Sequence, residues 1–279
     1  MAKTLGFYRN FQLSLDRLSG ALRCVKEDPT VSQEQLAAYL GANVPVGKGF
    51  SAWLRHTGLV EAESEDVWQA LQYSLTPFGR LASEYDPLLA DPGTQWLLHY
   101  YLATEHAERS DAWRLLINHF ISPGLSFTAE QFGRYCMNTL GREATNRAAL
   151  QKDPQAALNT YVRPTVLGRL GILTYGSGMY TVGRPDSPDT LVVGYMLFDR
   201  WQWAHPDTDT LRFSLLCQEV DNVGRIFVAE PSQIRRVLSD LAGRGYLTFS
   251  ETQHEPVNRL HHGPPAVLLE RYYKTRWTT

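Results

Sequence analysis

Residues 40–60 read Leu-Gly-Ala-Asn-Val-Pro-Val-Gly-Lys-Gly-Phe-Ser-Ala-Trp-Leu-Arg-His-Thr-Gly-Leu-Val, and the predicted architecture is built outward from them. A helical pattern from Gln33 to Leu40 comes first, and a turn containing glycine and proline leads into a second helix that ends at Gly58. A strand then begins at Leu59. Helix, short glycine-bearing turn, helix and strand is the order typical of a winged helix-turn-helix.

The second helix of this stretch divides into two faces at helical spacing. Its apolar stripe contains Phe50, Trp53, Leu54 and Thr57, and the opposite stripe contains the small or polar side chains Lys48, Ser51, Ala52 and Arg55. A face of small, hydroxyl and basic side chains suits a DNA major groove, so Lys48, Ser51 and Arg55 are predicted DNA contacts. An ordinary solvated helix and a protein-contact module remain alternatives.

The bulk composition is that of a globular protein without a strong electrostatic bias. The 279 residues are long enough for two or three small domains, with 43% hydrophobic and 20% charged residues. The formal net charge of −2 counts against a protein that coats nucleic acid. Any DNA contact must therefore come from basic side chains on individual faces of the protein.

Cysteine usage and hydropathy favour a cytoplasmic protein. Cys24, Cys136 and Cys217 lie far apart and form no pair with zinc-ligand spacing. The N-terminus has no apolar signal region, and no stretch approaches the length of a membrane span. We expect a reducing compartment and no membrane association.

The first module is predicted within residues 28–85, in an N-terminal domain of residues 1–90. Ser32 is the expected N-cap of its first helix, and Thr76 followed by Pro77 starts the helix after the wing. Thr94 is the expected cap of the next helix, which carries bulky side chains around most of its circumference. Such a helix is predicted to be a buried scaffold that joins the modules, and His99 within it is more typical of a hydrogen-bonded core residue than of a ligand.

A second module is predicted in residues 113–184, within a middle domain of residues 91–190. Thr128 is expected to cap one helix, and Asp153-Pro154 to open the next. Arg163 lies off the apolar stripe of that helix and is a predicted DNA contact. The sequence around Gly176-Ser177-Gly178 predicts a tight hairpin that closes the module.

The C-terminal domain, residues 191–279, repeats the pattern of the first module. Gln233, Arg235 and Arg236 lie outside the apolar stripe of its second helix and are predicted DNA contacts. A wing is predicted in residues 251–265 and should place His261 and His262 against phosphates, with a returning strand in residues 266–269. The predicted fold class is mainly α with short β-hairpins, an α+β protein of tandem winged helix-turn-helix modules around a buried helical linker.

Few residues have the spacing of a catalytic or cofactor site. The stretch from Gly41 to Lys48 has the wrong spacing for a phosphate-binding loop and carries Gly49 where that motif has Ser or Thr, so no nucleotide or organic cofactor is expected. The nearby carboxylates Glu84, Asp86 and Asp91 are able in principle to bind a divalent cation. Aspartate before proline is also ordinary turn chemistry, and that interpretation is favoured.

Several segments together resemble a bacterial family, domain of unknown function 4007. The resemblance rests on four matches: Phe7 to Phe11, Leu40 to Val60, Leu75 to Gly79 and the block Asp86 to Tyr100 that contains Trp-Leu-Leu-His. A helix from Trp113 to Phe120 also matches.

The resemblance implies a role in bacterial DNA phosphorothioation and anti-phage defence, where one family member is regarded as a DNA-nicking component. The implied partners are double-stranded DNA and other phosphorothioation proteins, and nicking would require Mg²⁺ or Mn²⁺. Asp86, Asp91 and His99 are the candidate catalytic residues. The alternatives are a non-catalytic assembly module, and a transcriptional regulator that acts as a homodimer on a palindromic site.

Overall fold

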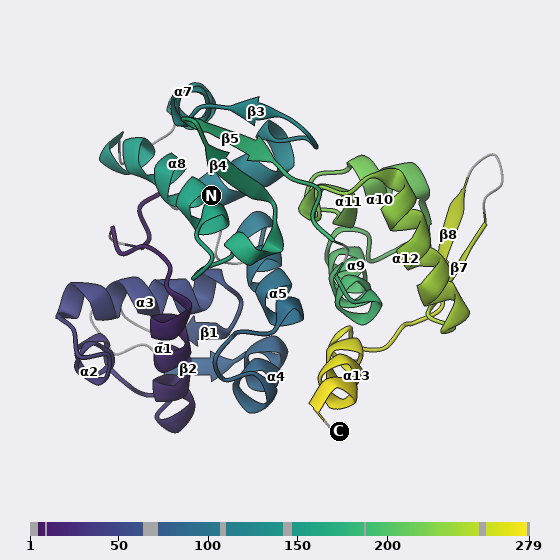
Figure 1. Cartoon of the computed structure of the whole chain (residues 1–279). Helices are drawn as coiled ribbons and strands as arrows, with labels where there is room; N and C mark the ends of the chain where they lie inside the picture. Colours follow the sequence, from purple (N-terminus) through teal and green to yellow (C-terminus); the bar gives the residue numbers. More distant parts are fainter. Residues whose placement is uncertain are drawn as a thin grey trace.

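The computed structural model describes residues 5–8, 10–63, 72–106, 110–141, 147–186, 188–250 and 255–277 (Figure 1). The first part of the chain contains four helices and one hairpin: α1 (Leu15–Glu27), α2 (Gln33–Tyr39), α3 (Val44–His56), β1 (Val60–Glu63), β2 (Gln72–Leu75) and α4 (Pro77–Tyr85). β1 and β2 are antiparallel, with Val60 opposite Leu75. Ser32 caps α2 in a capping box with Gln35, and Thr76 caps α4, which confirms both predicted helix starts.

The helix α5 (Pro92–Ala103) lies at the centre of the molecule (Figure 1). All its residues except Pro92 and Tyr101 are buried, which confirms the predicted buried scaffold helix. Its cap differs from the prediction, because Asp91 caps the helix and Thr94 lies inside the first turn. Its tyrosines join it to α9 later in the chain: the Tyr100 hydroxyl donates to Asp199 (2.7 Å), and the Tyr101 and Tyr195 hydroxyls share a 2.5 Å hydrogen bond.

The second part of the chain combines helices with a three-stranded sheet. Its elements are α6 (Asp111–Leu115), a π-helical turn η1 (Leu116–Phe120), β3 (Ser126–Phe127), α7 (Ala129–Leu140), α8 (Arg147–Val162), a 3₁₀ turn η2 (Gly168–Leu170), β4 (Leu173–Gly176) and β5 (Met179–Val182). The sheet order is β3-β5-β4. The predicted cap Thr128 and the hairpin at Ser177-Gly178 are confirmed. The predicted start of α8 at Asp153 is wrong, because the helix begins at Arg147 and contains Pro154.

The third part repeats this order of elements: α9 (Thr190–Ala204), β6 (Thr210–Arg212), α10 (Phe213–Gln218), α11 (Val223–Ile226), α12 (Pro231–Gly243), β7 (Leu247–Phe249), β8 (Pro256–Arg259) and α13 (Ala266–Trp277). The sheet order is β6-β8-β7, so the strand before the helix pair again contacts the last strand of the hairpin. The returning strand predicted in residues 266–269 is wrong, because these residues begin α13.

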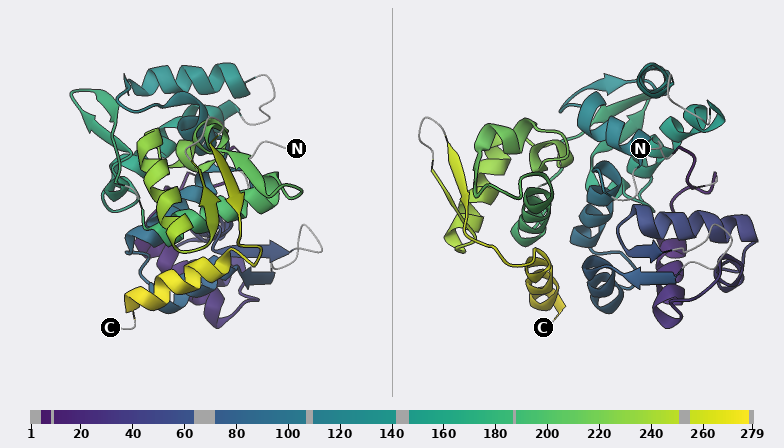
Figure 2. Two further views of the ribbon diagram at one scale, coloured as in Figure 1. Left: turned by 90° about the vertical axis from the view of Figure 1, so that its right-hand side faces the viewer. Right: turned by 180° about the vertical axis from the view of Figure 1, so that it is seen from behind.

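The last helix returns to the first part of the chain. α13 packs against α9 and α4, and Figure 2 shows it running beneath the third part. The Tyr273 hydroxyl is hydrogen bonded to Thr94 (2.7 Å), and the Tyr272 hydroxyl donates to Asp91 (2.5 Å). The α+β fold class is confirmed, with helices predominating and small antiparallel sheets. No helix among the described residues is long and apolar enough to cross a membrane.

Candidate nucleic-acid interface

The helix α3 is largely buried, including Ser51 and Ala52 of the face that the sequence predicted to contact DNA. Nine of its thirteen residues are buried. The Phe7 ring stacks on His56 with a centroid separation of 3.6 Å, and the indole of Trp53 donates to the Phe11 carbonyl (2.7 Å). The N-terminal segment therefore occupies one side of α3, and a Cβ at Gly47 would overlap the Gln33 carbonyl oxygen of α2 on another.

The three residues predicted on α3 lie in different surroundings. Ser51 is 1% exposed and its hydroxyl is hydrogen bonded to Tyr73 (2.7 Å), so its predicted outward position is wrong. Lys48 is half-buried. Arg55 is also half-buried and lines a cavity of about 200 Å³ together with Tyr101. The structure thus brings no continuous polar face together on α3.

The helix α8 carries an exposed polar face in the second part. Arg163 is exposed directly after the helix, as predicted. Gln151, Lys152 and Gln155 are also exposed on α8, and Gln155 donates to Asn159 (3.1 Å). The sequence analysis missed these residues, although amide side chains four residues apart on a helix were a readable signal.

On α12, one of the three predicted side chains is exposed and the other two are engaged in contacts. Arg236 is exposed. Gln233 is used locally, because its carbonyl oxygen accepts the backbone N–H of Glu230 (2.9 Å) and its amide donates to Pro185 (3.3 Å). Arg235 is ion-paired with Glu255, and its guanidinium lies 4.2 Å from the centroid of the Phe213 ring.

The exposed stripe of α12 runs through Arg236. Ser232 and Ser239 are exposed at four residues before and three residues after it, which is the spacing of one helical face. Arg244 is exposed at the end of the helix. This stripe of serine and arginine side chains is the most clearly solvent-facing of the surfaces predicted to contact DNA.

The two predicted histidines lie at the base of the β7–β8 hairpin. The ring of His261 packs near Phe198 (5.4 Å between centroids), and its Nε2 donates to the Pro264 carbonyl (3.3 Å). His262 is exposed, with its Nδ1 3.6 Å from Asp209. Residues 251–254 of the predicted wing lie outside the described residues.

The candidate catalytic residues Asp86 and Asp91 lie next to each other and hold backbone structure. Both carboxylate oxygens of Asp86 accept backbone N–H groups, from Ala90 (3.0 Å) and Asp91 (2.9 Å). Burial raises the pKa of Asp86 above its ordinary value, and these hydrogen bonds oppose the shift. Asp91 accepts the N–H groups of Gly93 (2.9 Å) and Thr94 (3.3 Å) as the cap of α5.

His99 lies further along α5 and has the partners of a core residue. It is fully buried, its Nε2 donates to the Ile226 carbonyl (2.8 Å), and its Nδ1 accepts from the Tyr161 hydroxyl (2.8 Å). Burial lowers its pKa to about 4, so the ring is neutral near pH 7. These contacts match the core role that the sequence favoured.

These residues do not fit a divalent cation as they stand. The Asp86 oxygens are used by backbone donors, and those of Asp91 are used by backbone N–H groups, Tyr272 and Arg276. Within the described residues there is no group of three or more His, Cys, Asp or Glu side chains able to hold a metal ion. The roles of Asp86, Asp91 and His99 in nicking therefore stay predictions.

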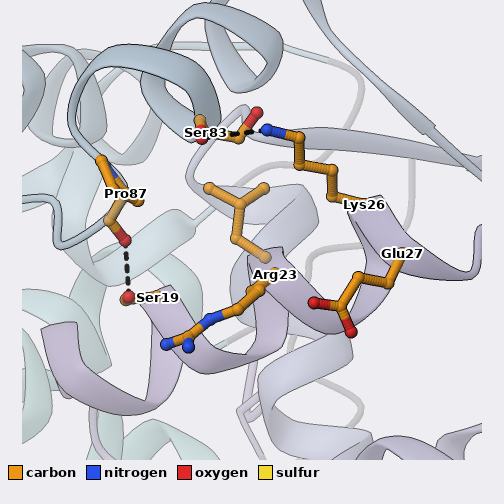
Figure 3. Close-up of a pocket in the computed structure, with 7 residues that line it drawn as sticks. Ser19, Arg23, Lys26, Glu27, Ser83 and Pro87 are labelled. Carbon is orange, nitrogen blue, oxygen red and sulfur yellow. Dashed lines mark hydrogen bonds between the residues drawn. The ribbon is translucent and has the colours of Figure 1, made fainter.

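A pocket between α1 and the end of α4 is shown in Figure 3. Its volume is about 410 Å³, and the Ser19 hydroxyl donates to the Pro87 carbonyl at 2.6 Å on its wall. Lys26 donates to the Ser83 carbonyl (3.2 Å). Glu27 also lines the pocket, together with Arg23 and Lys26.

These observations define the class of the protein as α+β, built around a buried central helix. A helical part with one hairpin comes first. Two sets of helices follow it, and each set ends in a three-stranded sheet. The chain belongs to the family described as Protein of unknown function (DUF4007), whose model matches residues 10–270. This confirms the family resemblance. None of the curated proteins matches the chain.

Two solved structures share the fold. A crystal structure of magnesium ion-bound SspB is 17% identical, with a TM-score of 0.81, and the match covers 99% of this chain and 88% of that chain. An SspB crystal structure is 18% identical with the same TM-score and coverage. At this identity the likeness establishes the architecture.

Proposed function

We propose that this protein is a DNA-binding component of a bacterial DNA phosphorothioation system with an anti-phage role, and that its three parts are winged-helix modules. In the second and third parts, a helix and a short strand precede two helices and a hairpin, and that short strand pairs with the last strand. This is the connectivity expected for winged-helix modules. The first part has the same helices and hairpin but lacks the short strand among its described residues.

The observation that carries the proposal is the exposed face of α12. In a winged-helix module the second helix of the pair enters the major groove. Arg236 on α12 has no hydrogen-bond or ion-pair partner among the described residues, and Ser232 and Ser239 flank it on the same face. An arginine between two hydroxyl side chains suits contact with phosphates or base edges.

The test is DNA binding by the purified chain across a salt series. Arg236→Glu should weaken binding to a labelled duplex by about tenfold or more, since it removes a cationic contact and adds repulsion. Arg17→Glu is the matched control, because Arg17 is also exposed but lies on α1. Equal affinities of the wild type and Arg236→Glu would refute the proposed α12 interface.

Nicking of one strand with Mg²⁺ or Mn²⁺ is part of this proposal. It is supported by the family resemblance and not by a preformed ligand cluster among the described side chains. Supercoiled plasmid incubated with and without each metal tests it. Relaxed circles that form only with metal support nicking, and a mobility shift without relaxation supports a binding role alone.

A second candidate function is assembly with other phosphorothioation proteins. Most residues of α3 are buried, and the β4–β5 hairpin exposes Tyr175 (59%) and Met179 (39%). Exposed aromatic and methionine side chains favour protein contacts. The double change Tyr175→Ser and Met179→Ser should weaken pairwise binding to a purified partner protein while leaving DNA affinity unchanged.

A further inference from the structure

The parts of the chain meet in a cleft of about 500 Å³ beside the first turn of α5. Its walls come from α5, η2, the segment between β5 and α9, and α13. Three arginines from three of these elements line it: Arg169, Arg184 and Arg276. Guanidinium groups present paired N–H donors that match the oxygens of a phosphate.

Close backbone packing holds Arg169 and Arg184 at the same cleft. The N–H of Gly183 donates to the Ile172 carbonyl (2.9 Å), and a Cβ at Gly183 would overlap the Gly171 carbonyl oxygen. The turn that carries Arg169 therefore lies directly against the segment that carries Arg184. Both arginines are exposed, and Arg169 makes no ion pair with the described side chains.

Asp91 positions the third arginine. The Arg276 Nε donates to the Asp91 carboxylate (2.8 Å), whose side chain is only 4% exposed. The Tyr272 hydroxyl donates to the other oxygen of Asp91 (2.5 Å). The two Nη nitrogens of Arg276 make no hydrogen bond to the described residues, so they remain available to a ligand.

The charge balance of the cleft selects the ligand. Asp186 and Asp189 also line it, and Asp189 accepts the Leu191 N–H (2.8 Å) as the cap of α9. Glu230 approaches Arg184 only to 3.9 Å. Three guanidinium groups face two lining carboxylates, and Asp91 behind Arg276 brings the formal charge balance to zero. A cleft without surplus positive charge disfavours a dianion or a polyphosphate, so the anion that its guanidinium donors suit best is a singly charged phosphodiester.

We propose that this cleft binds one phosphodiester group of a nucleic-acid backbone, with Arg169 and Arg184 as direct donors and Arg276 oriented by Asp91. The nucleic-acid source rests on the proposed DNA-binding function. The location supports it, since the Gly168 N–H donates to the Arg163 carbonyl (3.0 Å) and so joins η2 to the end of α8. The turn that carries Arg169 thus lies directly against the end of α8, beside the exposed Arg163.

The first experiment measures duplex binding by the full chain against salt concentration. The double change Arg169→Gln and Arg184→Gln should lower the slope of log affinity against log salt by about one for each phosphate that is no longer neutralised, and weaken binding by about tenfold. Arg17→Gln with Arg80→Gln is the control, because both arginines are exposed on α1 and α4 and the net charge changes equally. An unchanged slope and affinity in the cleft variant would overturn the inference.

The second experiment separates this inference from the proposed function. Dimethyl phosphate, a phosphodiester monoanion, is titrated into the ¹⁵N-labelled protein while the amide signals of Gly171 and Gly183 are followed. Saturable shifts that disappear in the double variant Arg169→Gln, Arg184→Gln support the phosphodiester site. If the same protein fails to bind duplex DNA, that failure refutes the proposed DNA-binding function and leaves the site standing. Absent shifts overturn the site, and tighter binding of inorganic phosphate overturns its phosphodiester assignment.

Discussion

The indole N–H of Trp53 donates a 2.7 Å hydrogen bond to the carbonyl oxygen of Phe11. This bond anchors the segment that precedes α1 on the side of α3, and the backbone N–H of Gly6 anchors the same segment to Asp153 of α8 (2.8 Å). Residues 5–8 and 10–14 therefore join the first and second parts of the chain. The segment thus packs on the apolar side of α3, where Trp53 is fully buried.

Phe7→Ala should destabilise the protein by about 2 kcal/mol, because the half-buried ring contacts Trp53, His56 and Trp113. Urea unfolding followed by tryptophan fluorescence measures this. Tyr39→Ala removes an aromatic ring that is 45% exposed and should change stability by less than about 0.5 kcal/mol. Equal effects of the two changes would contradict the packing of the N-terminal segment.

Gly47→Ala should destabilise the protein by about 2 kcal/mol or more, since the new methyl group would overlap the Gln33 carbonyl oxygen and force α2 and α3 apart. Gly133→Ala in α7 is the control, because no atom lies within 4 Å of a Cβ placed there. Its better helix propensity should stabilise by up to about 1 kcal/mol. Thermal unfolding of both variants checks the opposite signs.

Acid should destabilise the fold through its buried histidines. The pKa of His99 is lowered to about 4 by burial, while the unfolded residue titrates near 6.5. The unfolded state therefore binds more protons between these values, and the contribution of His99 to stability decreases as the pH falls from about 6.5 to about 4. Burial lowers the pKa of His56 to about 3 and of His106 to about 4, so both act in the same direction.

His99→Gln should flatten this pH dependence, because glutamine does not titrate. The measurement is the urea midpoint of wild type and variant from pH 7 to pH 5. Asp153 opposes the trend, since burial raises its pKa to about 6, but Asp153 is present in both proteins and cancels in the comparison. Parallel pH profiles would show that His99 is not the neutral core residue described.

Asp91→Ala should cost about 2–4 kcal/mol of folding stability, because it removes the α5 cap and leaves Tyr272 and Arg276 without their acceptor. Unfolding experiments and plasmid nicking are measured on the same preparations. Loss of stability in step with loss of any nicking indicates a positioning role. Loss of nicking at full stability would instead support the predicted catalytic role.

The sequence predicted helix starts more accurately than it predicted which side chains of a helix are exposed. Ser32, Thr76 and Thr128 cap helices where expected, because a cap depends on residues within one turn. The burial of Ser51 was not predictable from periodicity, since its hydrogen-bond partner Tyr73 lies 22 residues later in the chain. The strand predicted for residues 266–269 is wrong, because a short apolar run fits both a helix and a strand. These residues form the first turn of α13.

The candidate site shows the same limit. Arg236 is exposed, as predicted. Its neighbour Arg235 is instead ion-paired with Glu255 and packs over the ring of Phe213, and these two partners lie about twenty residues away on either side in the sequence. The arginine-lined cleft had no sequence signal at all. Its three guanidinium groups come from positions 169, 184 and 276, and only the tertiary structure brings them to one place.

The bonds from Tyr272 and Tyr273 to the first turn of α5 span 181 and 179 residues of sequence. During synthesis, α5 emerges from the ribosome long before these tyrosines exist. The aromatic surface of α5 therefore stays incompletely covered until α13 has been translated. Because such non-local contacts close late, we expect nascent chains that stop before α13 to be substrates for chaperones and proteases.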